Sequence, residues 1–198
     1  MKFLALAPAF NPSYTALGKL EHASDDVPLS KLRRGQLVGV ELGRKARFTR
    51  SKEPFRFGPS GKTTPAGAVV VDLFRNRQAG CFVVSPRLAE LLTRVDPALR
   101  PSRVGLSGVD GLDHGFVLTA PLVDALDLAA SKAKVEKFDG VPDEITRAKS
   151  LVLRTVPADR AVFRVPLLDD FWFVREDIEL AGFTGLELTD PATTTVGD

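Results

Sequence analysis

Residues that commonly build disulfides, metal sites and membrane anchors are scarce in this sequence. Its 198 residues include one cysteine, one methionine, one tryptophan, one tyrosine and two histidines. A single cysteine excludes an internal disulfide framework and is typical of a reducing compartment, so we expect a cytoplasmic protein. No apolar run approaches the roughly 18 residues of a membrane helix, so we expect no membrane span. An apolar content of 44% is enough for one sizeable core.

The first ten residues resemble the start of a secretory leader, because one lysine precedes a short apolar run. The run is too short for a leader, and Pro8 interrupts it. We therefore expect residues 2–7 to form the first strand of the core.

Charge is distributed unevenly along the chain, although the net charge is only +2. Residues 1–77 contain 14 Lys/Arg against 6 Asp/Glu, whereas residues 78–198 contain 13 against 19. This asymmetry indicates either two partner-binding surfaces or two solvated faces. We expect a basic strand and loop region over 1–77, continuous with a strand-rich core over 78–190. A small polar segment over 191–198 predicts a disordered tail.

Short apolar runs separated by turn residues predict a fold made mainly of strands. The runs lie at 36–42, 68–71, 81–84, 103–106, 115–119, 150–154, 161–165, 171–174 and 183–188. Ser85 as a cap, Pro86 at the first helical position and leucines at helical spacing predict a helix that ends before Pro97. A second short helix is expected over 174–182, ended by a glycine. The fold class is α+β, with a strand-rich mixed or antiparallel sheet and two or three short helices.

Several motifs that suggest catalysis or ligand binding fail on spacing or context. The segment 58–64 ends like a phosphate-binding loop, but Arg56 stands where that loop needs its first glycine, and Pro59 removes an amide donor. His22 and His114 have no histidine or cysteine at ligand spacing, so we expect no metal site. We expect His114 to be a hydrogen-bonded surface residue and Cys81 to be a small core residue. No catalytic residue and no cofactor are assigned.

The stretch 169–179 gathers acidic residues beside the aromatic residues Phe171 and Trp172. If 174–182 is helical, Glu176 and Glu179 share one side of the helix. They would then present negative charge next to an exposed edge of Trp172, together with Asp169 and Asp170. This cluster indicates either a solvated acidic face or a protein-docking patch.

The basic stretch 44–65 is rich in Arg, Lys, Gly and Pro and predicts a long mobile loop. Cations interspersed with phenylalanines over 44–56 could bind nucleic acid, which would give steeply salt-dependent retention on polyanions. Glu53 interrupts the basic run, which argues against nucleic-acid binding. A further alternative is an enzyme or toxin-associated effector with a carboxylate-lined cleft, which requires Cys81, His114 and an acid to converge.

Several short motifs follow one another along the chain: Phe82-Val83-Val84-Ser85 with Leu88, Phe116-Val117-Leu118 before Val123-Asp124-Ala125-Leu126-Asp127, Ser131, Val162-Phe163-Arg164-Val165, Phe173-Val174 and Ala181-Gly182-Phe183-Thr184-Gly185-Leu186-Glu187. In order and spacing they resemble the eleventh immunity-protein family of bacterial polymorphic toxin systems, over about residues 68–190.

The resemblance implies a cytoplasmic antidote that binds and blocks a cognate toxin protein, and it carries over no active site. We therefore expect a binding protein rather than an enzyme. The toxin, the docking surface and the oligomeric state stay open. The candidate toxin-binding residues are Asp169, Asp170, Trp172, Glu176 and Glu179.

Overall fold

A computed structural model describes residues 1–11, 13–21, 47–50, 55–57, 62–64, 69–74, 82–168 and 171–197. These parts of the chain are rich in strands, as predicted. They contain one α-helix, α2 (Pro86–Val95), and one 3-10 helix, η1 (Pro191–Thr193), so two or three short helices are not confirmed. No helix in the described ranges is long and apolar enough to cross a membrane.

The chain divides into two compact units, each assembled from distant parts of the sequence. Unit 1 comprises Met1–Ala7, Ala120–Glu179 and Glu187–Asp198, and unit 2 comprises Pro8–Thr119 and Leu180–Leu186. Unit 1 contains residues from both ends of the sequence, because strands from the two ends pair with each other.

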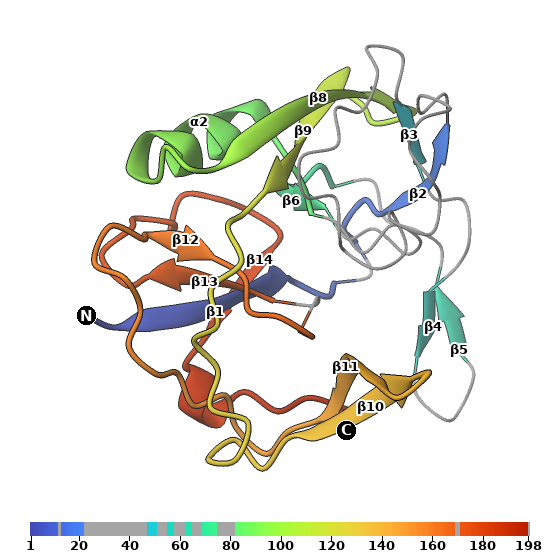
Figure 1. Ribbon diagram of the computed structural model, residues 1–198. Helices are drawn as coiled ribbons and strands as arrows, with labels where there is room; N and C mark the ends of the chain where they lie inside the picture. The colour runs from blue at the N-terminus through green and yellow to red at the C-terminus, as the bar shows by residue number, and fades with distance from the viewer. Residues whose placement is uncertain are drawn as a thin grey trace. The chain divides into compact units, whose positions relative to one another are not determined.

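Unit 1 is built on a four-stranded sheet in the order β12-β13-β1-β14 (Figure 1). Its strands are β1 (Phe3–Pro8), β12 (Val162–Phe163), β13 (Trp172–Arg175) and β14 (Leu186–Thr189). The first strand, predicted over 2–7, is confirmed, and it pairs antiparallel with β13. Phe163 stacks on Phe173 with ring centroids 5.3 Å apart, and Phe3 meets Phe163 edge to face at 5.1 Å. These three rings anchor the core of unit 1.

A separate β-hairpin in unit 1 was not predicted. It consists of β10 (Lys134–Phe138) and β11 (Val141–Arg147), which pair antiparallel. Asp139 and Gly140 connect them with φ angles of 50° and 81°, as a tight hairpin turn requires. Most described side chains of β11 are exposed, so an apolar pattern could not mark it. The Asp139-Gly140 pair was the sequence signal that could have predicted this hairpin.

The structure differs from three predictions made for the C-terminal part of the chain. Residues 174–182 form no helix, because the Glu176 N–H donates to the Lys2 carbonyl at 3.0 Å and so extends the pairing of β13 with β1. The expected strand at 150–154 is reduced to a single bridge between Leu153 and Leu126. Residues 191–197 are not a disordered tail, since they include η1 and the buried Val196, which exchanges two backbone hydrogen bonds with Ala148.

Unit 2 is built on a six-stranded mixed sheet in the order β2-β3-β8-β9-β7-β6. The strands are β2 (Leu17–Glu21), β3 (Arg47–Arg50), β6 (Leu73–Phe74), β7 (Val83–Val84), β8 (Arg100–Ser107) and β9 (His114–Thr119). Only the β3–β8 pairing is parallel among these neighbours. One apolar cluster includes the fully buried Phe48, Phe74 and Val83.

The basic stretch 44–65 contains three strands, so a continuous mobile loop is wrong for its described residues. Besides β3, these are β4 (Phe55–Phe57) and β5 (Lys62–Thr64), which pair with each other. Because Lys62–Thr64 is a strand, it cannot begin the helix that a phosphate-binding loop needs. The predicted strand at 36–42 and the core position of Cys81 lie outside the described residues.

The helix α2 confirms the prediction made from its cap and spacing. The Ser85 side chain accepts a hydrogen bond from the Leu88 N–H at 3.3 Å, and Pro86 occupies the first helical position. Leu88, Ala89 and Leu92 are buried. The helix ends at Val95, and Asp96, directly before Pro97, is its C-cap.

Candidate functional site

Of the five residues proposed to contact a partner, three are among the described residues. Glu176 and Glu179 are both exposed. Trp172 is only 2% exposed, so the expectation of an exposed indole edge is wrong. Its neighbours Phe173 and Val174 are also buried, which shows that β13 is covered on both faces. Asp169 and Asp170 lie outside the described residues.

The exposed acids form a short turn after β13, which we call the acidic turn (Glu176–Glu179). The Ile178 N–H closes it by donating to the Arg175 carbonyl at 3.1 Å. Ile178 is buried, whereas the three carboxylates of the turn face solvent. The charges are therefore displayed in unit 1 by a turn instead of the predicted helix.

Two of the three carboxylates in the acidic turn already have cationic partners. Lys2 Nζ lies 3.0 Å from Glu176 Oε1 and 3.8 Å from Asp190 Oδ2, and Arg175 Nε lies 2.5 Å from Asp177 Oδ1. The hydrogen bond and charge of Glu176 raise the pKa of Lys2, and the Arg175 guanidinium lowers the pKa of Asp177. Exposed pairs of this kind stabilise a fold weakly. Glu179 makes no ion pair with any described residue and is the free charge of the turn.

The acidic turn belongs to the more acidic of the two units. By sequence, unit 1 carries 10 Lys/Arg against 15 Asp/Glu, a net charge of −5. Unit 2 carries 17 against 10, a net charge of +7. The charge asymmetry seen along the sequence is therefore a property of the two compact units.

A cavity of about 420 Å³ lies beside Lys2 in unit 1 and was not anticipated from the sequence. It is lined by Met1, Lys2, Phe3, the segment 151–156, Asp190, Pro191 and Ala192. Phe3, Leu151 and Pro191 are buried, whereas Arg154 is exposed and Asp190 is half-buried. The cavity thus combines buried apolar side chains with charged ones. Three stretches of sequence that are far apart must meet to form it.

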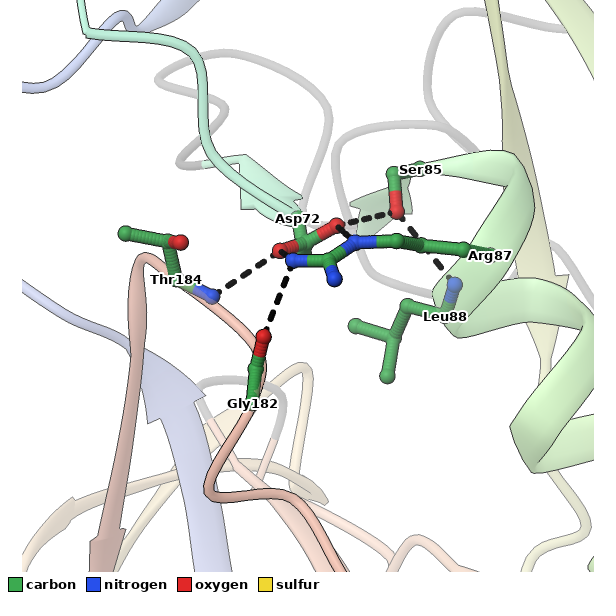
Figure 2. A network of polar contacts seen from close by, with 6 residues as sticks. All are labelled: Asp72, Ser85, Arg87, Leu88, Gly182 and Thr184. Carbon is green, nitrogen blue, oxygen red and sulfur yellow. Dashed lines mark hydrogen bonds and ion pairs between the residues drawn. The ribbon is translucent and has the colours of Figure 1, made fainter.

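A cluster of polar residues lies in unit 2 around Asp72 (Figure 2). The Asp72 carboxylate, 7% exposed, accepts hydrogen bonds from Ser85 Oγ at 2.6 Å, Arg87 Nε at 2.7 Å and the Thr184 N–H at 2.9 Å. The second Arg87 nitrogen bonds the other carboxylate oxygen and also donates to the Gly182 carbonyl at 3.0 Å.

This network holds the segment 180–186 against the rest of unit 2. Burial alone would raise the pKa of Asp72, but the hydrogen bonds from Arg87, Ser85 and Thr184 outweigh it and lower the pKa below its ordinary value. The Arg87 guanidinium also lies 4.6 Å from the centre of the Phe183 ring. Because every acceptor has a donor, the cluster is best explained as a structural clamp and offers no reactive group.

The clamp gives a structural role to residues in two of the motifs that carry the family resemblance. Ser85 belongs to one and Thr184 to the other, and both bond to Asp72. Asp72 itself was missed by sequence reasoning. Its signal was a single carboxylate inside an otherwise apolar run, Val71-Asp72-Leu73, where burial requires a charged partner.

Of the residues required by the enzyme alternative, the structure places His114, whereas Cys81 lies outside the described residues. His114 Nδ1 lies 2.5 Å from Asp113 Oδ1, which confirms a hydrogen-bonded histidine near the surface. The His114 ring lowers the pKa of Asp113 by this hydrogen bond. Within the described ranges no group of three or more His, Cys, Asp or Glu could hold a metal ion, and Cys81 is outside them.

The geometry therefore defines a strand-rich scaffold with a structural clamp, an acidic turn and a neighbouring cavity. Comparison with known families gives the class. A model of the immunity protein family Imm11 matches residues 3–193, so the chain belongs to this family. The match confirms the resemblance and extends it through the N-terminal residues that the motifs did not cover. A search of the curated proteins finds no match to this chain.

Proposed function

We propose that this chain is an immunity protein that binds a cognate bacterial toxin in the cytoplasm and neutralises it by covering its active site or an essential surface. Membership of the immunity protein family over nearly the whole chain is the observation that carries this proposal. An inhibitor of this kind needs a rigid scaffold and a complementary surface, and it needs no catalytic group.

The acidic turn is the proposed centre of the binding surface, and Asp169 and Asp170, close to it in sequence, belong to the same proposal. Unit 1 has a net charge of −5, and Glu179 is exposed without an ion-pair partner in the described residues. A cationic toxin surface would be attracted to such a face, which accelerates association. Trp172 is left out of this surface because it is buried.

Coexpression tests the function even while the toxin is unidentified. Each open reading frame next to the gene of this chain is expressed in a bacterial host with and without the chain. One of them should arrest growth alone, and the chain should restore growth and copurify with that product. If a neighbouring product is toxic and the chain neither rescues growth nor binds it, the proposed pairing is wrong.

Charge reversal tests the surface. The double variant Glu176→Lys, Glu179→Lys is expected to lower the association rate with that toxin by roughly tenfold or more at low salt, and less at high salt, because salt screens exposed charges. The rate is measured by stopped-flow fluorescence. Adding Asp169→Lys and Asp170→Lys should enlarge the effect.

Glu90→Lys is the matched control, because Glu90 is an exposed acid on α2 in unit 2 that makes no ion pair with a described residue. It makes the same change in net charge as the single variant Glu179→Lys, with which it is compared, and should leave the association rate nearly unchanged. If Glu90→Lys and Glu179→Lys lower the association rate equally, net charge, and not the acidic turn, governs the encounter.

A further inference from the structure

The segment 151–156 in unit 1 pairs with residues 125–127 through one antiparallel bridge, between Leu153 and Leu126, and this pairing uses one edge of the segment only. On that edge, the Asp127 N–H donates to the Val152 carbonyl at 2.8 Å, and the Arg154 N–H donates to the Ala125 carbonyl at 2.6 Å. Backbone groups of successive residues in an extended chain point to opposite edges. The N–H and carbonyl of Leu153 therefore point to the other edge.

That other edge faces the cavity. The Leu151 N–H, which points the same way as that of Leu153, donates to the Pro191 carbonyl at 2.8 Å, and Pro191 lines the cavity together with residues 151–156. Beyond this bond, no described residue makes a hydrogen bond to the N–H or carbonyl of Leu153. The cavity is thus bordered by a backbone edge at which the N–H and carbonyl of Leu153 have no partner among the described residues.

The open edge and the cavity together match a known mode of recognition. An extended peptide can add to a free strand edge through main-chain hydrogen bonds, while alternate side chains enter pockets beside it. The cavity, about 420 Å³, has Phe3, Leu151 and Pro191 as buried apolar wall residues, and it has room for one large apolar side chain. Anchors of this kind dominate the energetics of many protein interfaces.

We infer that the toxin docks by adding an extended segment to the edge at Leu153, with an apolar side chain in the cavity. This inference rests on the proposed function and deepens it. Lys2 lines the cavity and is bonded to Glu176 of the acidic turn at 3.0 Å, so one partner can engage both features. A symmetric pair of copies joined edge to edge at Leu153 fits less well, because it would bring two units of charge −5 together.

Amide hydrogen exchange tests strand addition directly. In the free protein the Leu153 amide should exchange quickly, because it has no hydrogen-bond acceptor in the described chain. Adding the toxin identified by coexpression should slow its exchange by about tenfold or more, while the Arg154 amide, already bonded to Ala125, changes less. A complex that forms with no change at Leu153 would overturn the inference and leave the proposed function intact. If no toxin binds at all, it is the proposed function that fails.

A matched pair of variants tests the cavity. Ala192→Trp places a large ring at the cavity wall and should weaken toxin binding by about tenfold or more, measured by calorimetry. Ala158→Trp makes the same change at an exposed position of unit 1 outside the cavity and should leave the affinity unchanged. Thermal melting of both variants shows whether each retains its fold.

Two results would reject the cavity as the toxin site. One is an equal affinity of Ala192→Trp and the wild type. The other is a wild-type protein that is a dimer by light scattering and becomes monomeric in Ala192→Trp, which would assign the edge to a second copy of the chain. Hydrogen exchange at Leu153 gives an independent result if Ala192→Trp fails to fold.

Discussion

Replacing Gly185 by alanine is expected to lower the free energy of unfolding by about 2–5 kcal/mol, from the cost of a left-handed backbone and of overpacking. Gly185 has a φ angle of +79°, which residues with a Cβ atom rarely adopt. A Cβ atom built on it would lie 2.4 Å from the Cβ atom of Val71, so the two segments would have to separate. Because Gly185 lies in the segment held by the Asp72 clamp, that separation would also strain the clamp.

Gly182→Ala is the control for this prediction, only three positions away. A Cβ atom at Gly182 would meet nothing within 4 Å, and its carbonyl bond to Arg87 would be kept. We expect its stability to change by no more than about 0.5 kcal/mol. Urea denaturation followed by circular dichroism measures both variants; tryptophan fluorescence is less suitable because Trp172 lies in unit 1. Similar losses in the two variants would contradict the close approach at Gly185.

Local signals in the sequence predicted the elements that depend on neighbouring residues. The helix α2 follows from a serine cap, a proline and leucines at helical spacing, all within one short stretch. The strands β8 and β9 follow from apolar runs on either side of a turn, where Gly108 and Gly111 adopt φ angles of 75° and 72°. The family resemblance also relied on short motifs, and the family match confirms it.

Features that depend on distant residues could not be predicted in the same way. The acidic turn replaces the expected helix because the Glu176 N–H finds an acceptor in Lys2, at the other end of the chain. Trp172 is buried for the same reason, since its strand lies between β1 and β12. The cavity needs residues from positions 1–3, 151–156 and 190–192. Linear patterns identified the charges of the candidate site but not the geometry that presents them.

The Asp72 clamp should make a large part of the stability of unit 2 depend on one carboxylate. Asp72→Ala leaves the Ser85 hydroxyl and the Thr184 N–H without their acceptor and removes the ion pair with Arg87. We expect a loss of about 2–4 kcal/mol, because hydrogen bonds to a charged group are strong and unsatisfied buried donors are costly. Asp110→Ala, at an exposed aspartate of the same unit, should change stability by less than about 0.5 kcal/mol.

The same carboxylate should give the clamp a distinct pH dependence. The folded protein holds the pKa of Asp72 below its ordinary value of 3.8, so the folded state binds fewer protons than the unfolded state in the pH range between the two values. The stabilisation is therefore fully present above the ordinary value and is lost as the pH falls through the lower, folded-state pKa. The stability difference between wild type and Asp72→Asn, measured by urea denaturation, should be constant from about pH 5 to 7 and shrink below about pH 4. A difference that stayed the same at pH 3 and pH 7 would show that the clamp does not depend on the ionised carboxylate.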